Sequence, residues 1–504
     1  MSVDPRTPVI IGVAQITIGR EQRPAPEPLL GWEQVCKEAL ADAGVDPAMA
    51  TQIDTVLVAD VMSWRYDYPL ARLAERLGAT PRHMAMGKPS GTSGQTMLDE
   101  AAAAIRDGTA DIALVCGGES LATMRDYRKA GSMPPWSHVH PEGPEYAFDL
   151  DEVQHPGEVA IGLTEGIGAV YGFAMRDVAR RAHMGVVPDA YRSALGETLA
   201  GMTRVAATNP HAWFRQARDA AFLTEPRLDN RMVAYPYTKH MVAIIDVDIY
   251  AALIVVSQKW ADAHGIAAEK RVYPWTSCYA EDPVFIGVRD KLWKSDAMEA
   301  ASKAALTAAG VTMDDIRHVD LYSCFASAVN FGRDALGIAH RGGDEVTVTG
   351  GLPYAGGPAS SYMITSITRM VEILRGDSGS IGLISGVGMM MSNHIYGLYS
   401  TTPPPIVLVH PDHAAVQALV DAIPQRMIED DYVGPAVVAT YTIMHDNLGN
   451  PSHGAAICDL PGGARSYVRI IDSALLAWAE REEMVGRSVT IGAGGTTGVI
   501  TAVY

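Results

Sequence analysis

Residues 39–45 read ALADAGV, and residues 305–311, which lie 266 positions later, read ALTAAGV. With no gap, Asp54 then falls on Asp320. Each copy continues an amphipathic helical pattern that ends at a glycine, the residue that most often closes a helix in the left-handed conformation. The matches in the same order indicate that the chain contains a duplicated unit, which tends to build its site along the shared axis.

The repeat continues through a glycine-rich turn into a second apolar strand. Gly91, in the run SGTSG, falls on Gly357, in the run GGPAS. With about three residues of slip, the apolar segment 111–117 falls on segment 380–386. Each unit therefore alternates helix and strand, which predicts an α/β layered fold with parallel strands. Two such units predict one five-layered αβαβα body.

The remaining segments suggest an insertion and a further domain. The first unit, 1–266, is interrupted at 119–240, and we expect this insertion to form a lid over the sheet edge. The second unit covers 267–402. Consecutive prolines then predict a stiff hinge. Beyond it, residues 403–504 hold short strand patterns joined by Gly, Asn and Pro turns, which predict a small antiparallel β-barrel.

Composition narrows the range of partners. The 504 residues carry a formal net charge of −18, so nucleic acid and anionic membranes are not expected as partners. Five scattered cysteines without a CxxC pair suit a reducing cytosol and predict no metal site. The most apolar stretch, 241–256, is interrupted by Asp246 and Asp248, and the N-terminus does not resemble a signal peptide. We expect a cytoplasmic protein.

Gly91 and Gly357 are candidates for the chemical centre because each precedes a predicted helix in its own unit. Backbone N–H groups and the helix dipole at such a terminus stabilise an anion or a developing oxyanion. If the units pack about one axis, both turns face a common cleft. The alternative is that both are glycines required only by a tight turn.

Residues 5–402 resemble the thiolase superfamily, specifically the sterol-carrier-protein-type thiolases and their thiolase-like relatives. The resemblance rests on the duplicated pattern and on four loops. It implies the duplicated thiolase fold and a coenzyme A thioester as substrate or ligand, with no covalently bound cofactor.

The four loops lack the reactive side chains of that family. The nucleophilic cysteine is replaced by Gly91, and the activating histidine of Gly-His-Pro is replaced by Gly357. The family's His-Asp-Cys-Phe motif becomes YSCF, beginning at Tyr322, and the acid/base cysteine of Cys-x-Gly-Gly-Gly becomes Ile384. The glycines that would hold a substrate, Gly91, Gly357 and Gly386, remain. Because an acyl-enzyme requires an activated thiolate, ordinary thiolysis is not expected.

Three side chains are candidates for remaining chemistry. Tyr322 stands where aldolases of the superfamily have Tyr-Asp-Cys-Phe, so the resemblance implies that it takes a proton from a β-hydroxyl while backbone amides hold the enolate. Ser323 replaces the aspartate of that motif. Tyr354 is a second candidate phenol, and His394 is expected to face the same pocket. The alternatives are hydrogen-bonded structural tyrosines and a structural histidine at a strand end.

The predicted barrel resembles the oligonucleotide/oligosaccharide-binding (OB)-type domain of the DUF35 proteins that accompany thiolase-like aldolases. The similar segments are 434–442 and 484–489. No stripe of basic and aromatic residues accompanies them, which disfavours a nucleic-acid role. We interpret the domain as a fused accessory that shapes the acyl tunnel or covers an oligomer face.

These observations leave three functional hypotheses. The first is a thiolase-fold protein that binds an acyl-CoA thioester and breaks or forms a C–C bond by retro-aldol chemistry, without covalent catalysis. The second is a non-catalytic acyl-CoA binder or partner subunit. The third is an acyltransferase that uses Ser90, Ser93 or Cys324. The oligomeric state stays open.

Overall fold

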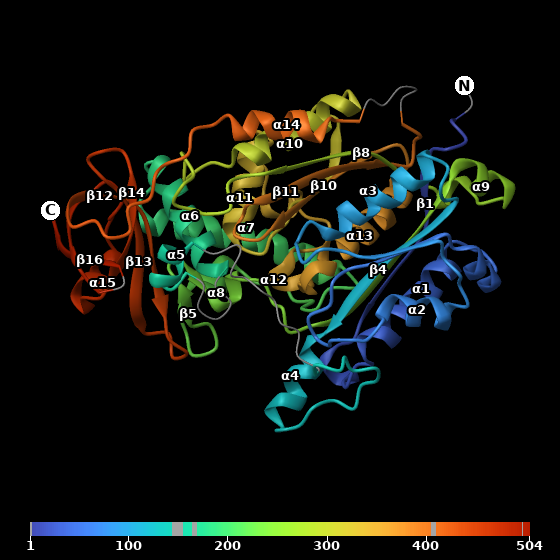
Figure 1. Cartoon of the computed structure of the whole chain (residues 1–504), viewed down its shortest axis with the longest axis horizontal. Coiled ribbons are helices and arrows are strands. Elements are labelled where there is room, and N and C mark those ends of the chain that lie inside the picture. The colour runs from blue at the N-terminus through green and yellow to red at the C-terminus, as the bar shows by residue number, and fades with distance from the viewer. Residues whose placement is uncertain (1–2, 144–154, 164–168, 405–409, 496) are drawn as a thin grey trace.

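The computed structural model of the chain describes residues 3–143, 155–163, 169–404, 410–495 and 497–504 (Figure 1). A layered body of helices and sheets lies beside a small β-barrel, so the predicted fold class is confirmed. Pro405 of the predicted hinge and two parts of the predicted insertion, 144–154 and 164–168, lie outside the described residues.

The first sheet has the strand order β1-β7-β4-β2-β3. Strands β2, β3 and β4 run parallel, whereas β7 is antiparallel to both β4 and β1. Every residue of β7 is buried, which explains its unbroken apolar sequence. The strands are β1 (Pro8–Thr17), β2 (Thr55–Val58), β3 (His83–Met86), β4 (Ile112–Ser120) and β7 (Asp248–Ser257).

The second sheet has the order β8-β11-β10-β9. Only β9 and β10 run parallel, and β11 is antiparallel to β10 and β8. The expectation of parallel strands is therefore wrong for part of each sheet. A short connection between β10 and β11 permits only antiparallel pairing, since a parallel pair needs a long crossover. The strands are β8 (Tyr273–Glu281), β9 (Ile316–Asp320), β10 (Ile381–Gly388) and β11 (Asn393–Ser400).

Helices form the other three layers (Figure 1). α3 (Ser93–Arg106) and α13 (Tyr362–Gly376), the matching helices of the two units, lie between the sheets. They approach closely because Gly94 has no side chain: a β-carbon there would lie 2.7 Å from the Ile364 amide nitrogen. α1 (Pro28–Asp42) and α2 (Pro69–Leu77) cover the first sheet, and α10 (Asp296–Ala309) covers the second.

The predicted ends of the repeated helices are also observed. Gly44 follows α1 with a φ of 70°, and Gly310 is the C-cap of α10 with a φ of 68°. Both lie in the left-handed region that glycine enters at little cost.

The barrel consists of five strands that close through pairing of β12 with β13. Most pairs are antiparallel as predicted, but β14 and β16 run parallel. They are separated by a helix and another strand, a connection long enough for parallel pairing. The elements are β12 (Gly434–His445), β13 (Pro451–Asp459), β14 (Arg465–Ile470), α15 (Ser473–Ala479), β15 (Ser488–Ala493) and β16 (Gly498–Val503).

Within its described residues, the insertion contributes helices and strands to the contact between the body and the barrel. Its helix α6 (Ala169–His183) is buried over most of its length and packs between the body and β12 of the barrel (Figure 1). Its strands β5 (Met232–Ala234) and β6 (Tyr237–Thr238) extend the barrel sheet through the pairing of Ala234 with Met444. Apolar side chains along α6 explain this burial, because they require partners on both sides.

The remaining elements connect these layers. α14 (His413–Asp421) packs on α10 and β8 of the body, although it lies in the segment predicted to belong to the barrel. The other helices are α4 (Leu121–Lys129), α5 (Pro156–Ala160), α7 (Pro188–Thr208), α8 (Ala220–Thr224), α9 (Gln258–Ala263), α11 (Ala326–Ala335) and α12 (Leu352–Ala355). The 3-10 helices are η1 (Arg20–Gln22), η2 (Pro47–Gln52), η4 (Lys239–Met241), η5 (Ala268–Lys270), η6 (Gly343–Glu345) and η7 (Ala359–Ser361). No helix within the described ranges has the length and apolar character needed to cross a membrane.

Candidate active site

Gly91 and Gly357 lie on the wall of one cavity of about 340 Å³. Gly91 belongs to the turn between β3 and α3, and Gly357 lies between α12 and η7, which leads into α13. The two glycine turns of the duplicated unit therefore share a cleft, as the repeat predicts. The cavity wall also includes two insertion residues, Val170 and Val233.

Most of the cavity wall is apolar. Ring packing fixes Phe325, whose ring centroid lies 4.6 Å from that of Phe173 on α6. A small, largely apolar cavity with a few polar groups is typical of a ligand site. The other lining residues are Asp60, Met62, Pro89, Ser90, Val242, Ala243, Ile245, Tyr322, Cys324, Leu352, Ala359 and Ser360.

Tyr322 lies where β9 ends and is only 7% exposed. Its amide donates a hydrogen bond to Ser385 Oγ (2.9 Å), and its ring packs edge-on against Tyr362 at 5.4 Å. Burial raises the pKa of the phenol above its ordinary value, and the nearby Cys324 adds to this effect. At neutral pH the Tyr322 hydroxyl is therefore protonated, so it can donate a hydrogen bond but is a poor base.

Gly91 has no room for a side chain. A β-carbon there would lie less than 3.0 Å from both the Val387 carbonyl oxygen and the Tyr322 hydroxyl oxygen. Real β-carbons do not make such approaches, so a cysteine at residue 91 would force backbone to move. The hydroxyl of Tyr322 fills the space that a nucleophile at residue 91 would need.

The amides of the two glycines differ in availability. The Gly357 amide donates to the Ile244 carbonyl oxygen (2.9 Å), so it is not free to bind an oxyanion in this structure. No acceptor for the Gly91 amide is found among the described residues. The expectation of two equivalent donors is therefore not met by this geometry, and Gly357 contributes cavity wall instead.

Gly386 and Ile384 lie on β10, and their contacts are those of packing within the fold. A β-carbon at Gly386 would lie 3.1 Å from the Gly91 carbonyl oxygen, so this glycine lets the Gly91 turn approach the strand. Ile384 is fully buried and pairs with Gly397 and Asp320 on the neighbouring strands. Neither residue is part of the cavity wall described above.

Tyr354 and His394 are not brought to the cavity wall. The Tyr354 hydroxyl donates to the His240 carbonyl oxygen (3.1 Å). His394 is fully buried on β11, where its Nε2 lies 3.3 Å from Asp282 Oδ2, and burial lowers its pKa. Both placements correspond to the structural alternatives considered for these residues.

The three candidate nucleophiles of the acyltransferase hypothesis are also poorly positioned or poorly activated for attack on a ligand. Ser93 donates to the Lys88 carbonyl oxygen and is buried away from the cavity wall. Ser90 lies on the wall, but its hydroxyl pairs with Thr92 Oγ1 (2.8 Å). Cys324 also lies on the wall, and burial raises the pKa of its thiol, which disfavours the thiolate.

Asp60 is a cavity residue that the sequence analysis missed. It lies just after β2 and is 4% exposed. Its signal in the sequence was its position at the carboxyl end of a predicted parallel strand, where ligand sites of α/β sheets form. Nearby Glu119 is fully buried, and burial raises its pKa to about 7, with the charge of Asp60 contributing. No group of three or more metal-ligating side chains lies within the described parts of the chain.

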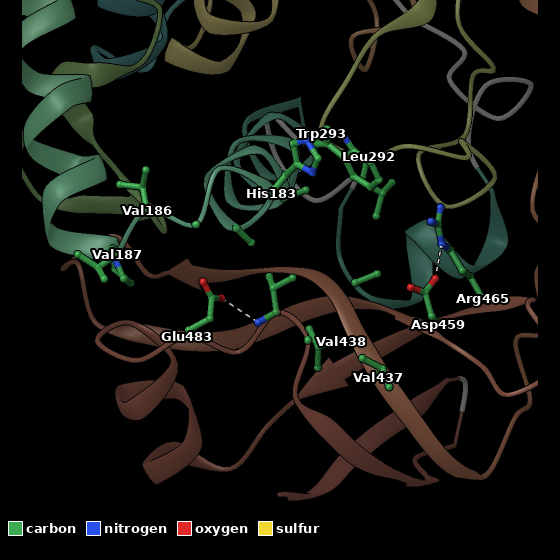
Figure 2. A pocket seen from close by; sticks show the side chains of 17 residues that line it. His183, Val186, Val187, Leu292, Trp293, Val437, Val438, Asp459, Arg465 and Glu483 are labelled. Carbon is green, nitrogen blue, oxygen red and sulfur yellow. Dashed lines mark hydrogen bonds and ion pairs between the residues drawn. The ribbon is translucent and has the colours of Figure 1, made fainter.

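A larger cavity, of about 580 Å³, lies between the body and the barrel (Figure 2). Figure 2 shows His183 and Trp293 on one side and Val437 and Val438 of β12 on the other. The charged residue Arg465, at its edge, is already paired with Asp459 at 2.8 Å. Size alone therefore does not make this cavity the better site, since the smaller one holds the duplicated turns.

Known proteins share the fold of this chain. A model of the thiolase N-terminal domain matches residues 9–225. A crystal structure of a monomeric SCP2-thiolase-like protein type 1 from Mycobacterium smegmatis is 30% identical, with a TM-score of 0.84, and the match covers 99% of this chain and 100% of that one. The chain thus belongs to the thiolase superfamily and, within it, to the SCP2-thiolase-like proteins.

More distant structures share the fold alone. The Ltp2-ChsH2(DUF35) aldolase is 18% identical, with a TM-score of 0.59 over 78% of this chain and 98% of that one. Human mitochondrial 3-ketoacyl-CoA thiolase is 15% identical, with a TM-score of 0.57 over 79% of this chain and 100% of that one. No curated protein sequence matches this chain.

Proposed function

We propose that this chain binds an acyl-CoA thioester in the Gly91–Gly357 cavity and cleaves or forms a C–C bond without a covalent intermediate. The observation that carries the proposal is the contact of the Tyr322 hydroxyl with the Gly91 turn. This contact supports the proposal because residue 91 corresponds to the nucleophile of thiolases, and a phenol beside it can donate a hydrogen bond to a ligand. Apolar walls suit the acyl part of such a ligand.

The proposed reaction is the retro-aldol cleavage of a 3-hydroxyacyl thioester. A base takes the proton of the 3-hydroxyl, the O–H electrons form a C=O bond, and the C2–C3 bond breaks. Its electrons form an enolate of the shortened thioester, which is then protonated at C2. We assign Tyr322 and the Gly91 amide to hydrogen bonding of the thioester oxygen, which becomes negative in the transition state.

This role differs from the one expected from sequence. Tyr322 was expected to act as the base, but a buried phenol with a raised pKa remains protonated at neutral pH. A protonated phenol stabilises an oxyanion, and removing one such donor from an enzyme typically lowers kcat by ~10²–10³. A cytosolic location stays a prediction.

The test is an assay of 3-hydroxyacyl-CoA thioesters of increasing chain length, with detection of the carbonyl product and the shortened acyl-CoA. We expect the wild type to cleave at least one of them. Tyr322→Phe should lose ~10²–10³-fold in kcat while binding of saturated acyl-CoA persists. Binding without cleavage across the whole series would favour the alternative, a non-catalytic acyl-CoA binder or partner subunit.

A further inference from the structure

Asp60 is the carboxyl group of the cavity. Of the lining residues that the structure describes, it alone carries a carboxyl group, and it shares the wall with Tyr322 and Gly91. Because the other walls are mostly apolar and the side chain is 4% exposed, holding a charge there costs free energy. Ionisable groups placed at such cost in a cavity are candidates for catalysis.

Hydrogen bonds fix the loop that carries Asp60. The Ala59 amide donates to the Cys116 carbonyl oxygen (2.8 Å). Directly after Asp60, the amides of Met62 and Ser63 donate to the two carboxyl oxygens of Glu119, at 2.7 and 2.9 Å. Glu119 thus anchors the loop between the ends of β2 and β4, which holds Asp60 against the cavity.

The two carboxyl groups have different surroundings. The two carboxyl oxygens of Glu119 accept the Met62 and Ser63 amides, and Glu119 is not among the lining residues of the cavity. Burial raises the pKa of Glu119 to about 7, and the charge of Asp60 adds to this effect. Asp60 is therefore the carboxyl group of this pair that lies on the cavity side, where it can accept a proton from a ligand.

We propose that Asp60 is the general base of the site, taking the proton from the 3-hydroxyl of a bound 3-hydroxyacyl thioester. This inference rests on the retro-aldol function proposed above. The proton moves from the hydroxyl oxygen to the Asp60 carboxylate as the C2–C3 bond breaks. Asp60 then returns it to C2 of the enolate, so no proton is gained or lost overall and no oxidant or reductant is needed. Glu119 is a positioning residue.

The test compares Asp60→Asn and Asp60→Ser with Asp314→Asn, a matched control whose side chain is exposed in the turn between α10 and β9. The probe is the 3-hydroxyacyl-CoA that the wild type cleaves fastest, and binding is measured separately with hexanoyl-CoA. We expect both Asp60 variants to lose ~10²–10⁴-fold in kcat, the usual contribution of a general base, and to keep hexanoyl-CoA affinity within about threefold. Asp60→Glu should recover part of kcat, which a purely structural role would not predict.

Three outcomes would overturn the inference. Retention of more than a tenth of kcat in Asp60→Asn would remove Asp60 from the reaction while leaving the proposed function intact. Loss of hexanoyl-CoA binding in both variants would show that Asp60 only supports the cavity wall. A wild type that binds acyl-CoA but cleaves nothing would instead defeat the proposed function, and the role of Asp60 with it.

Discussion

The hydroxyl of Tyr322 lies against the α-carbon of Gly91, so close that a β-carbon on residue 91 would overlap it. The tyrosine at one strand end and the glycine in the opposite unit therefore depend on each other. The packing leaves no space for a nucleophilic side chain at residue 91, because the Val387 carbonyl oxygen blocks the same position from another side.

Gly91→Ala should destabilise the protein by about 1–3 kcal/mol, the usual cost of overpacking, because its methyl group meets backbone and a buried ring. The matched control is Gly376→Ala at the end of α13, where a β-carbon meets no atom within 4 Å. Chemical denaturation of both variants measures the difference. Equal midpoints would contradict the packing described for residue 91.

Gly91→Cys should not acquire thiolase activity. The thiol would meet the same obstruction, and the activating histidine of the family is Gly357 in this chain. After incubation with acetoacetyl-CoA, intact-mass analysis should detect no acyl-enzyme in either this variant or the wild type. An acetyl adduct on the wild type would favour the acyltransferase hypothesis.

Val242→Phe should shorten the acyl chain that the protein accepts, since Val242 lines the cavity of about 340 Å³. Each methylene excluded from an apolar pocket typically costs about 1–3 kcal/mol. The ratio of propionyl-CoA affinity to hexanoyl-CoA affinity should therefore be at least tenfold higher in the variant than in the wild type. Val437→Phe, in the larger cavity beside the barrel, is the matched control. If only the control changed the preference, the larger cavity would be the acyl site.

Glu119→Gln should alter how stability depends on pH. Burial raises the pKa of Glu119 to about 7 from an ordinary 4.5, so folding favours its protonated form. That contribution is complete below about pH 4.5 and is lost as the pH rises through about 7, for a total of about 3 kcal/mol. The free energy of unfolding of the wild type should therefore fall relative to the variant over this range. A constant difference between the two would contradict the raised pKa.

Arg465→Met should weaken the attachment of the barrel to the body. The Arg465 side chain is 4% exposed and donates to three carbonyl oxygens of the body, those of Gly287, Arg289 and Asp290. A hydrogen bond to a charged group typically contributes about 1.5–3 kcal/mol, so we expect a loss of at least that size. Exposed Arg487→Met is the control. Thermal unfolding and limited proteolysis between body and barrel measure the effect, and equal curves would refute the link.

Local sequence patterns predicted the helices and strands well where apolar residues recur with the period of a helix or form a continuous buried strand. The repeated apolar segment 380–386 corresponds to β10, and the helix predicted after Gly357 is α13. The direction of a strand could not be predicted in the same way. A fully buried strand such as β7 has the same apolar sequence whether its neighbours run parallel or antiparallel to it. His394 illustrates the same limit: its partner Asp282 is on a different segment, and no local pattern joins them.

The sequence alone determined the duplicated architecture, the barrel and the replacement of the reactive residues, because these depend on residue type and spacing along the chain. Only the tertiary structure decided that Tyr322 occupies the space beside Gly91, that the Gly357 amide is already bonded, and that Asp60 reaches the cavity. Those relationships join residues more than a hundred positions apart, and they are set by the packing of the two units against each other.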